Sequence, residues 1–188
     1  YSAYARQHFG LELASQTTVK FAAPPMLNQL MLRDQLDAVV NFWHYAAELK
    51  THDKRSLLTM DEVLGSWQIS ADVPVIGWLF KQSWAAENPA LVDQFFAMSF
   101  ATRAKMNEDD NLWQCIPSFT QKYSDDARPV LIAHYRAGIP TRFDASIKAD
   151  LQKLFKVLKA NEGTTGVTGA LQSLPDSLFW QSPALAGQ

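Results

Sequence analysis

Amide, aromatic and imidazole side chains follow one another at Asn41, Phe42, Trp43 and His44. Asn and His side chains can orient a ligand by hydrogen bonds and aromatic rings offer flat apolar walls, the mixture found in small-molecule clefts. The preceding apolar run, Leu36–Val40, is short and β-branched at its end, which predicts a buried strand. Asn41–His44 would then lie at the carboxyl end of this strand, where open parallel α/β sheets bind ligands.

Two further segments are expected at the same edge, Ala22–Met26 and Asp72–Ile76. The Pro24-Pro25 pair predicts the start of a helix, whose first-turn N–H groups form an anion site. The prolines leave Met26 and Leu27 to supply these donors. The alternative is that Phe42 and Trp43 pack a domain interface and that His44 caps a helix. The candidate ligand-binding residues are Ala23, Pro24, Met26, Asn41, Phe42, Trp43, His44, Pro74 and Val75.

Other chemistry has little support in the residue pattern. The four histidines, His8, His44, His52 and His134, form no i, i+4 pair with each other or with Cys115. A single cysteine cannot form an intrachain disulfide or a multi-thiolate metal site. The Gly-x-Ser-x-Gly turn of many serine hydrolases is also missing from the sequence. We therefore expect no catalytic residue, no metal and no cofactor.

The composition is that of an ordinary globular protein, with 47% hydrophobic and 19% charged residues and a net charge of -2. A net charge of this sign and size does not predict electrostatic binding to nucleic acid or to an acidic membrane surface. No apolar run approaches the about 20 residues of a membrane span, so we expect a protein that is not membrane-embedded. Residues 1–10 resemble the second half of a helix that ends at Gly10. We expect a processed or truncated chain whose upstream part is absent.

The predicted elements begin with a βαβ unit and continue with helices. Thr17–Phe21 and Leu36–Val40 are predicted strands on either side of a helix from about Pro25 to Asp34, which requires parallel pairing. Further along, the sequence predicts a helix at His44–Lys50, strands at Ser56–Thr59 and Ile76–Phe80, a turn-rich link at Asp61–Gly65, and helices that begin at Asn88, at Asp125 or Asp126, and at Asp144.

The succession of segments over residues 1–105 resembles a known family, the periplasmic substrate-binding proteins of ABC importers, in the nitrate/sulfonate/taurine-like class. The matching segments are Tyr4–Leu11, Val19–Pro25, Gln35–Trp43, Leu57–Thr59, Gly77–Phe80 and Glu87–Pro89. The chain departs from the family pattern at Asp34, where the family has glycine. The resemblance implies an α/β, type II periplasmic-binding-protein-like fold of two lobes that lacks its N-terminal segment. Residues 1–72 would form most of the second lobe, and residues 73–188 the hinge crossing and the C-terminal helical part of the first lobe.

The resemblance implies a non-enzymatic receptor in the periplasm, with its signal peptide removed. Such a receptor captures a small ligand between its lobes and delivers it to an ABC transporter permease. The aromatic pair Phe42 and Trp43 favours an anionic or planar conjugated ligand, such as a quinone-like acid, an aromatic sulfonate or a pyrimidine. Two alternatives stay open: a pyrimidine-precursor-synthase-like enzyme with His44 as base or iron ligand, and a helical interaction domain formed by residues 88–180.

Overall fold

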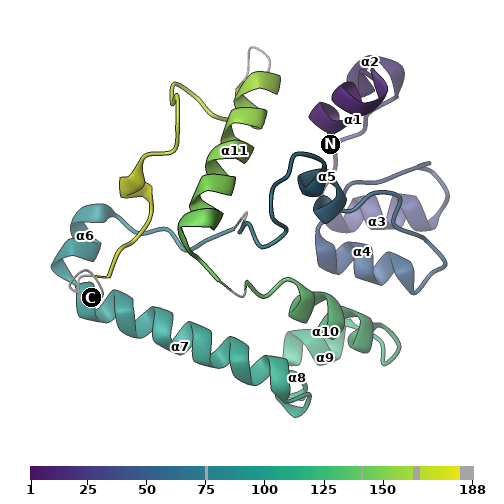
Figure 1. Ribbon diagram of the computed structural model, residues 1–188. Helices are drawn as coiled ribbons and strands as arrows, with labels where there is room; N and C mark the ends of the chain where they lie inside the picture. The colour runs from purple at the N-terminus through teal and green to yellow at the C-terminus, as the bar shows by residue number, and fades with distance from the viewer. Residues whose placement is uncertain (75, 141, 163–165, 183–188) are drawn as a thin grey trace. The chain divides into compact units, whose positions relative to one another are not determined.

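The computed structural model describes residues 1–74, 76–140, 142–162 and 166–182. All regular secondary structure in these ranges is helical (Figure 1). The expected α/β fold with two periplasmic-binding-protein-like lobes is therefore wrong, because the described part of the chain forms no sheet.

The four predicted strands, Thr17–Phe21, Leu36–Val40, Ser56–Thr59 and Ile76–Phe80, are connecting segments. Their apolar side chains lie largely in solvent; for example, Phe21 is 94% exposed, Leu57 79% and Leu79 88%. β-branched and aromatic residues favour a strand only where neighbouring strands supply packing and hydrogen bonds. Each segment is too short to stand without such neighbours, so the residue pattern alone does not make a strand.

The chain divides into two compact units. The first contains Tyr1–Val73 and Asp125–Ser173, and the second contains Pro74–Ser124 and Leu174–Gln188. The chain leaves the first unit after Val73 and returns to it at Asp125.

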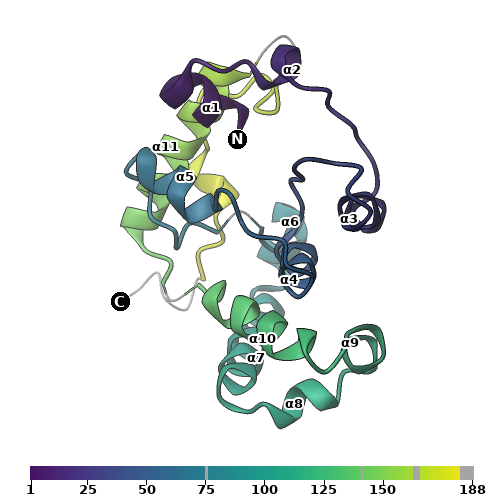
Figure 2. The same cartoon turned by 90° about the vertical axis from the view of Figure 1, so that its right-hand side faces the viewer.

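Seven helices of the first unit are described. They are α1 (Ser2–Phe9), α2 (Leu13–Gln16), α3 (Pro24–Leu32), α4 (Trp43–Lys50), α5 (Met60–Ser66), α10 (Ala127–Ala137) and α11 (Ala145–Asn161). Helices α3 and α4 lie side by side, and α10 packs on α4 (Figure 1). At the other end of this unit, α1 and α5 lie against α11 (Figure 2).

Local signals explain where several of these helices begin and end. Helix α1 ends at Gly10, as predicted, because Gly10 adopts the left-handed conformation with φ 65°. The predicted turn-rich link Asp61–Gly65 is wrong, since these residues belong to α5. Thr59 caps this helix: its hydroxyl accepts from the N–H of Glu62, whose carboxylate accepts from the N–H of Thr59.

A small core joins α5 to α11. Leu64, Ile69 and Val73 are buried, and Leu151 and Leu154 of α11 pack against them together with Trp67. The indole N–H of Trp67 also donates to the amide oxygen of Gln7 in α1 at 2.6 Å. Each buried aliphatic side chain contributes roughly 1.5–3 kcal/mol, so these contacts are a main source of stability in this unit.

The second unit contains α6 (Gln82–Glu87), α7 (Pro89–Glu108), α8 (Asn111–Gln114), α9 (Pro117–Lys122) and a 3-10 turn, η1 (Asp176–Leu178). Aromatic rings from α7 and the segment before it contact one another, for example Trp78 with Phe95 at 5.0 Å between centroids. The C-terminal segment is attached through Asp93, which accepts from the indole N–H of Trp180 at 3.1 Å and from the Ser182 hydroxyl at 2.6 Å.

In the described ranges, no helix combines the length and the apolar character that crossing a bilayer requires.

Candidate functional site

The predicted segment Ala23–Met26 forms the start of α3. Ala23 is the extended residue before the helix, and Pro24 and Pro25 occupy the first positions, where a missing N–H costs nothing. The side chain of Met26 is 55% exposed in this first turn. An α-helix leaves its first N–H groups without intrahelical partners, and at this helix Met26 carries the earliest such donor after the prolines.

The second predicted segment, Asn41–His44, forms the start of α4 instead of the end of a strand. Phe42 is the extended residue before the helix, and its N–H donates to Oδ1 of Asn41 at 2.9 Å. Trp43 and His44 are the first two helical residues. The strand-end explanation for this site is therefore wrong, and a helix N-terminus takes its place.

Hydrogen bonds join the starts of the two helices. The side-chain amide of Asn41 donates to the backbone oxygen of Pro24 and to Oδ1 of Asn28, both at 3.0 Å. One turn further on, the amide of Asn28 donates to the backbone oxygen of Tyr45 and to Oε2 of Glu48, both at 3.1 Å. Early residues of α3 thus contact early residues of α4, and later residues contact later ones. The helices run parallel, with their N-termini at the same end.

This arrangement concentrates positive potential. Each helix N-terminus carries about half an elementary positive charge from its aligned peptide dipoles. Parallel packing places two such ends together, and Asn41 lies between them. A negative group close to the N–H groups of Met26 and Trp43 would be stabilised by both helices.

Aromatic side chains surround the start of α4. Phe42 and Trp43 are 56% and 46% exposed. The rings of Phe42 and His44 are parallel, with 6.1 Å between their centroids, and the Trp43 ring lies 5.3 Å from that of His44. Tyr135 of α10 lies 6.3 Å from Trp43. The start of α4 therefore offers exposed flat surfaces beside the helix N-terminus.

The third predicted segment, Asp72–Ile76, is divided between the two units. Pro74 belongs to the second unit, and Val75 lies outside the described residues. The two residues stay predictions, and the candidate site consists of the two first-unit segments.

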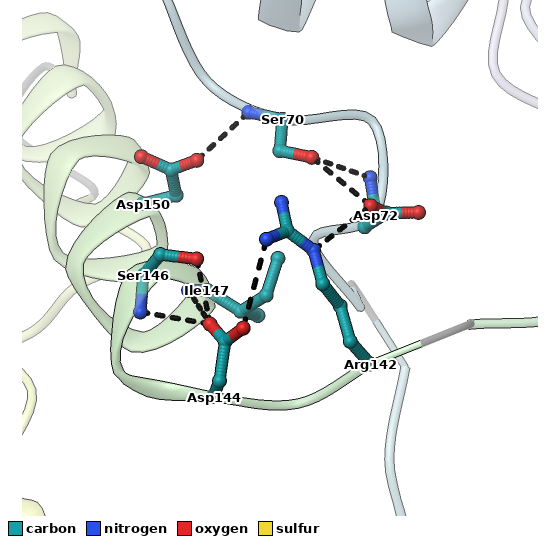
Figure 3. Close-up of polar contacts among 7 residues, drawn as sticks. All are labelled: Ser70, Asp72, Arg142, Asp144, Ser146, Ile147 and Asp150. Carbon is teal, nitrogen blue, oxygen red and sulfur yellow. Dashed lines mark hydrogen bonds and ion pairs between the residues drawn. The ribbon is translucent and has the colours of Figure 1, made fainter.

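Asp72, at the start of that third segment, takes part in polar contacts that hold the chain on α11 (Figure 3). Arg142 pairs with Asp72 at 3.3 Å and with Asp144 at 3.6 Å. The N–H of Ser70 donates to Asp150 at 2.9 Å. Hydrogen bonds from the Ser146 hydroxyl and the backbone hold the pKa of Asp144 below its ordinary value, as befits a helix cap. These contacts give the side chains of Asp72, Arg142, Asp144 and Asp150 a structural role, which needs no ligand to explain it.

Next to the site, α4 and α10 also contact each other through a basic pair. The Lys50 ammonium lies 3.1 Å from Nε2 of His134. Because an ammonium group can only donate, Nε2 must accept, which places the proton of neutral His134 on Nδ1. The pKa of His134 is lowered mainly by burial, and the positive charge of Lys50 lowers it further.

Sequence reasoning missed Asn28 and Glu48, which fix the two helices to each other. Asn28 is only 2% exposed. A signal was present, because Asn is a poor helix former and Asn28 interrupts the apolar run of α3. Within the described ranges, no three His, Cys, Asp or Glu side chains are grouped so that they could hold a metal ion.

Comparisons with known proteins give no family assignment: no family model matches the sequence, and no curated protein matches it significantly.

Proposed function

We propose that the chain binds a small anion with a planar, conjugated body at the paired N-termini of α3 and α4, without changing it chemically. The observation that carries this proposal is the hydrogen bond from Asn41 to Pro24, which holds the two helix starts together beside exposed aromatic rings.

The residues of the site have distinct roles in this proposal. The N–H groups of Met26 and Trp43 donate to the anionic group, and Ala23 and Pro24 form the adjoining wall. Phe42 and His44, whose rings are parallel, stack on the planar body, and the Trp43 ring, at 78° to that of His44, contacts its edge. Both amide hydrogens of Asn41 already have acceptors inside the protein, so Asn41 positions the helix starts and does not donate to the ligand.

The magnitudes indicate weak binding by this site alone. A charge at an exposed helix N-terminus gains about 0.3–1 kcal/mol, so two N-termini give about 2 kcal/mol at most. Aromatic stacking adds about 0.5–1.5 kcal/mol beyond the burial of ring surface. If the burial of ring surface offsets the entropy cost of association, the total is about 4 kcal/mol at most, which corresponds to a dissociation constant of about 1 mM.

We further propose that the chain works in the periplasm and delivers the bound ligand to the permease of an ABC transporter. This part of the proposal is supported by the resemblance of Val19–Pro25 and Gln35–Trp43 to substrate-binding proteins, because these segments contain the two helix starts. Asp34, where that family has glycine, has a φ of 53°, the left-handed conformation that glycine favours.

Thermal-shift titration tests the binding with three probes at millimolar concentration. Benzenesulfonate is anionic and planar, methanesulfonate is anionic but not planar, and benzamide is planar but neutral. We expect benzenesulfonate to raise the melting temperature most, because only this probe uses both the helix N-termini and the rings.

Trp43→Ala should reduce the shift caused by benzenesulfonate part of the way toward that caused by methanesulfonate, because the rings of Phe42 and His44 remain. Trp84→Ala is the matched control, because Trp84 has a similar exposure, 40%, but belongs to the second unit. An equal response to all three probes, or equal effects of the two substitutions, would contradict the proposal.

A further inference from the structure

The buried amide of Asn28 has its orientation fixed by its neighbours. On one side it faces the backbone oxygen of Tyr45 and the carboxylate of Glu48, which are both acceptors. The Asn28 NH2 group must therefore point to them, and Oδ1 must point the other way, toward Asn41. A buried amide is costly unless its hydrogen bonds are made, so this orientation is strongly preferred.

The orientation of the Asn41 amide is fixed in the same way. Its NH2 group has two acceptors, Oδ1 of Asn28 and the backbone oxygen of Pro24. Its oxygen is left to accept from the N–H of Phe42 at the start of α4. A chain of hydrogen bonds with one direction thus runs from the Glu48 carboxylate through two amides to the backbone that precedes Trp43.

We propose that Asn28 and Glu48 are positioning residues for the anion site: they set the orientation of Asn41 and so the placement of the Trp43 N–H beside the start of α3. The inference rests on the proposed function for its effect on binding, but the hydrogen-bond direction can be tested without ligand. An apolar residue at position 28 would suffice for packing alone, since α3 and α4 are otherwise joined by ordinary helix contacts.

Three variants separate this role from simple destabilisation. Asn28→Asp replaces the NH2 group with an oxygen that faces two acceptors, so the chain of hydrogen bonds is broken at its centre. In the double variant Asn28→Asp with Glu48→Gln, the glutamine amide again gives the pair a donor. Asn161→Asp is the control: its amide donates to the backbone oxygen of Val157 in α11, and the substitution adds the same charge to the same unit.

Each variant is titrated with benzenesulfonate at a temperature where its circular dichroism shows it to be folded. We expect binding about tenfold weaker in Asn28→Asp, recovery of a large part of this loss in the double variant, and unchanged binding in Asn161→Asp, since coupled polar pairs are typically worth a factor of this size. Wild-type affinity in folded Asn28→Asp, no recovery in the double variant, or an equal loss in Asn161→Asp would each overturn the inference.

The ligand-free readout is the side-chain NH2 resonance of Asn41 in protein labelled with nitrogen-15 asparagine. It should shift in Asn28→Asp, return toward its wild-type position in the double variant, and stay unchanged in Asn161→Asp. If the wild type does not bind benzenesulfonate but these resonances behave as expected, the proposed function fails and the hydrogen-bond chain stands. If the wild type binds benzenesulfonate but the Asn41 resonance does not change when Asn28 is substituted, the inference fails and the site stands.

Discussion

Replacing Asn41 by alanine removes the side chain that joins α3 to α4. Asn28, which is 2% exposed, then loses the donor to its Oδ1 in a place that water does not readily reach. An unsatisfied buried acceptor of this kind costs about 1–3 kcal/mol. The oxygen of Pro24 and the N–H of Phe42 also lose their partners, at about 0.5 kcal/mol each because both lie closer to solvent. The local unfolding free energy should therefore fall by about 3 kcal/mol.

Amide hydrogen exchange is the suitable assay, because it reports α4 separately from the second unit. A loss of about 3 kcal/mol corresponds to exchange roughly a hundredfold faster in the peptide that covers α4. Asn161→Ala is the control, since its amide makes one bond within α11, to Val157. This control should leave exchange in α4 unchanged. If Asn41→Ala accelerates exchange in α4 no more than Asn161→Ala does, the amide does not hold the two helices together.

Three further predictions concern the first unit. Leu64→Ala should lower the free energy of unfolding by about 2–5 kcal/mol, because Leu64 is only 2% exposed. Leu57 is 79% exposed, so Leu57→Ala should change this free energy by less than about 0.5 kcal/mol, and urea unfolding of both variants tests the difference. Thr59→Ala should cost about 1 kcal/mol and speed exchange in α5, and unchanged exchange there would exclude the capping role. His134 binds a proton less readily in the folded protein than in the unfolded chain, so the unfolding free energy should fall as the pH is lowered through the ordinary histidine value of about 6.5 and level off below the folded-state pKa. Unfolding measured against pH should show a smaller fall in His134→Gln and in Lys50→Met, and an unaltered fall in both would refute this assignment.

The helix starts that the sequence predicted correctly depend on local chemistry. Pro24 and Pro25 open α3, and Asp144 caps α11 by accepting from the N–H groups of Ser146 and Ile147. Such signals act over three or four residues, so they can be found without knowing the fold. The capping box of Thr59 and Glu62 is equally local, but the sequence prediction placed Thr59 in a strand and Glu62 in a turn-rich link.

The predicted strands failed because a strand depends on partners that lie elsewhere in the chain. Leu36–Val40 has the composition of a buried strand, but Val40 is 66% exposed and the run connects α3 to α4. No local feature distinguishes such a segment from a strand, since β preference reflects packing on neighbours. The α/β fold was inferred from these runs, and it was wrong for the same reason.

The grouping of two predicted segments has a different physical reason from the one expected. Ala23–Met26 and Asn41–His44 do lie together, but as two helix starts and not as two strand ends. Asn28 and Glu48 were missed because their hydrogen bond joins residues twenty positions apart. A pairing over that separation follows from the parallel packing of α3 and α4, which the sequence does not reveal.

The most direct measurement of the central claim is a titration of the nitrogen-15-labelled protein with benzenesulfonate, followed by backbone amide chemical shifts. We expect the largest saturable shifts at the amides of Met26 and Trp43, with smaller shifts at the same positions for methanesulfonate. Shifts confined to other residues, or no saturable shift at these two amides up to several times the expected dissociation constant of about 1 mM, would contradict an anion site at the paired N-termini of α3 and α4.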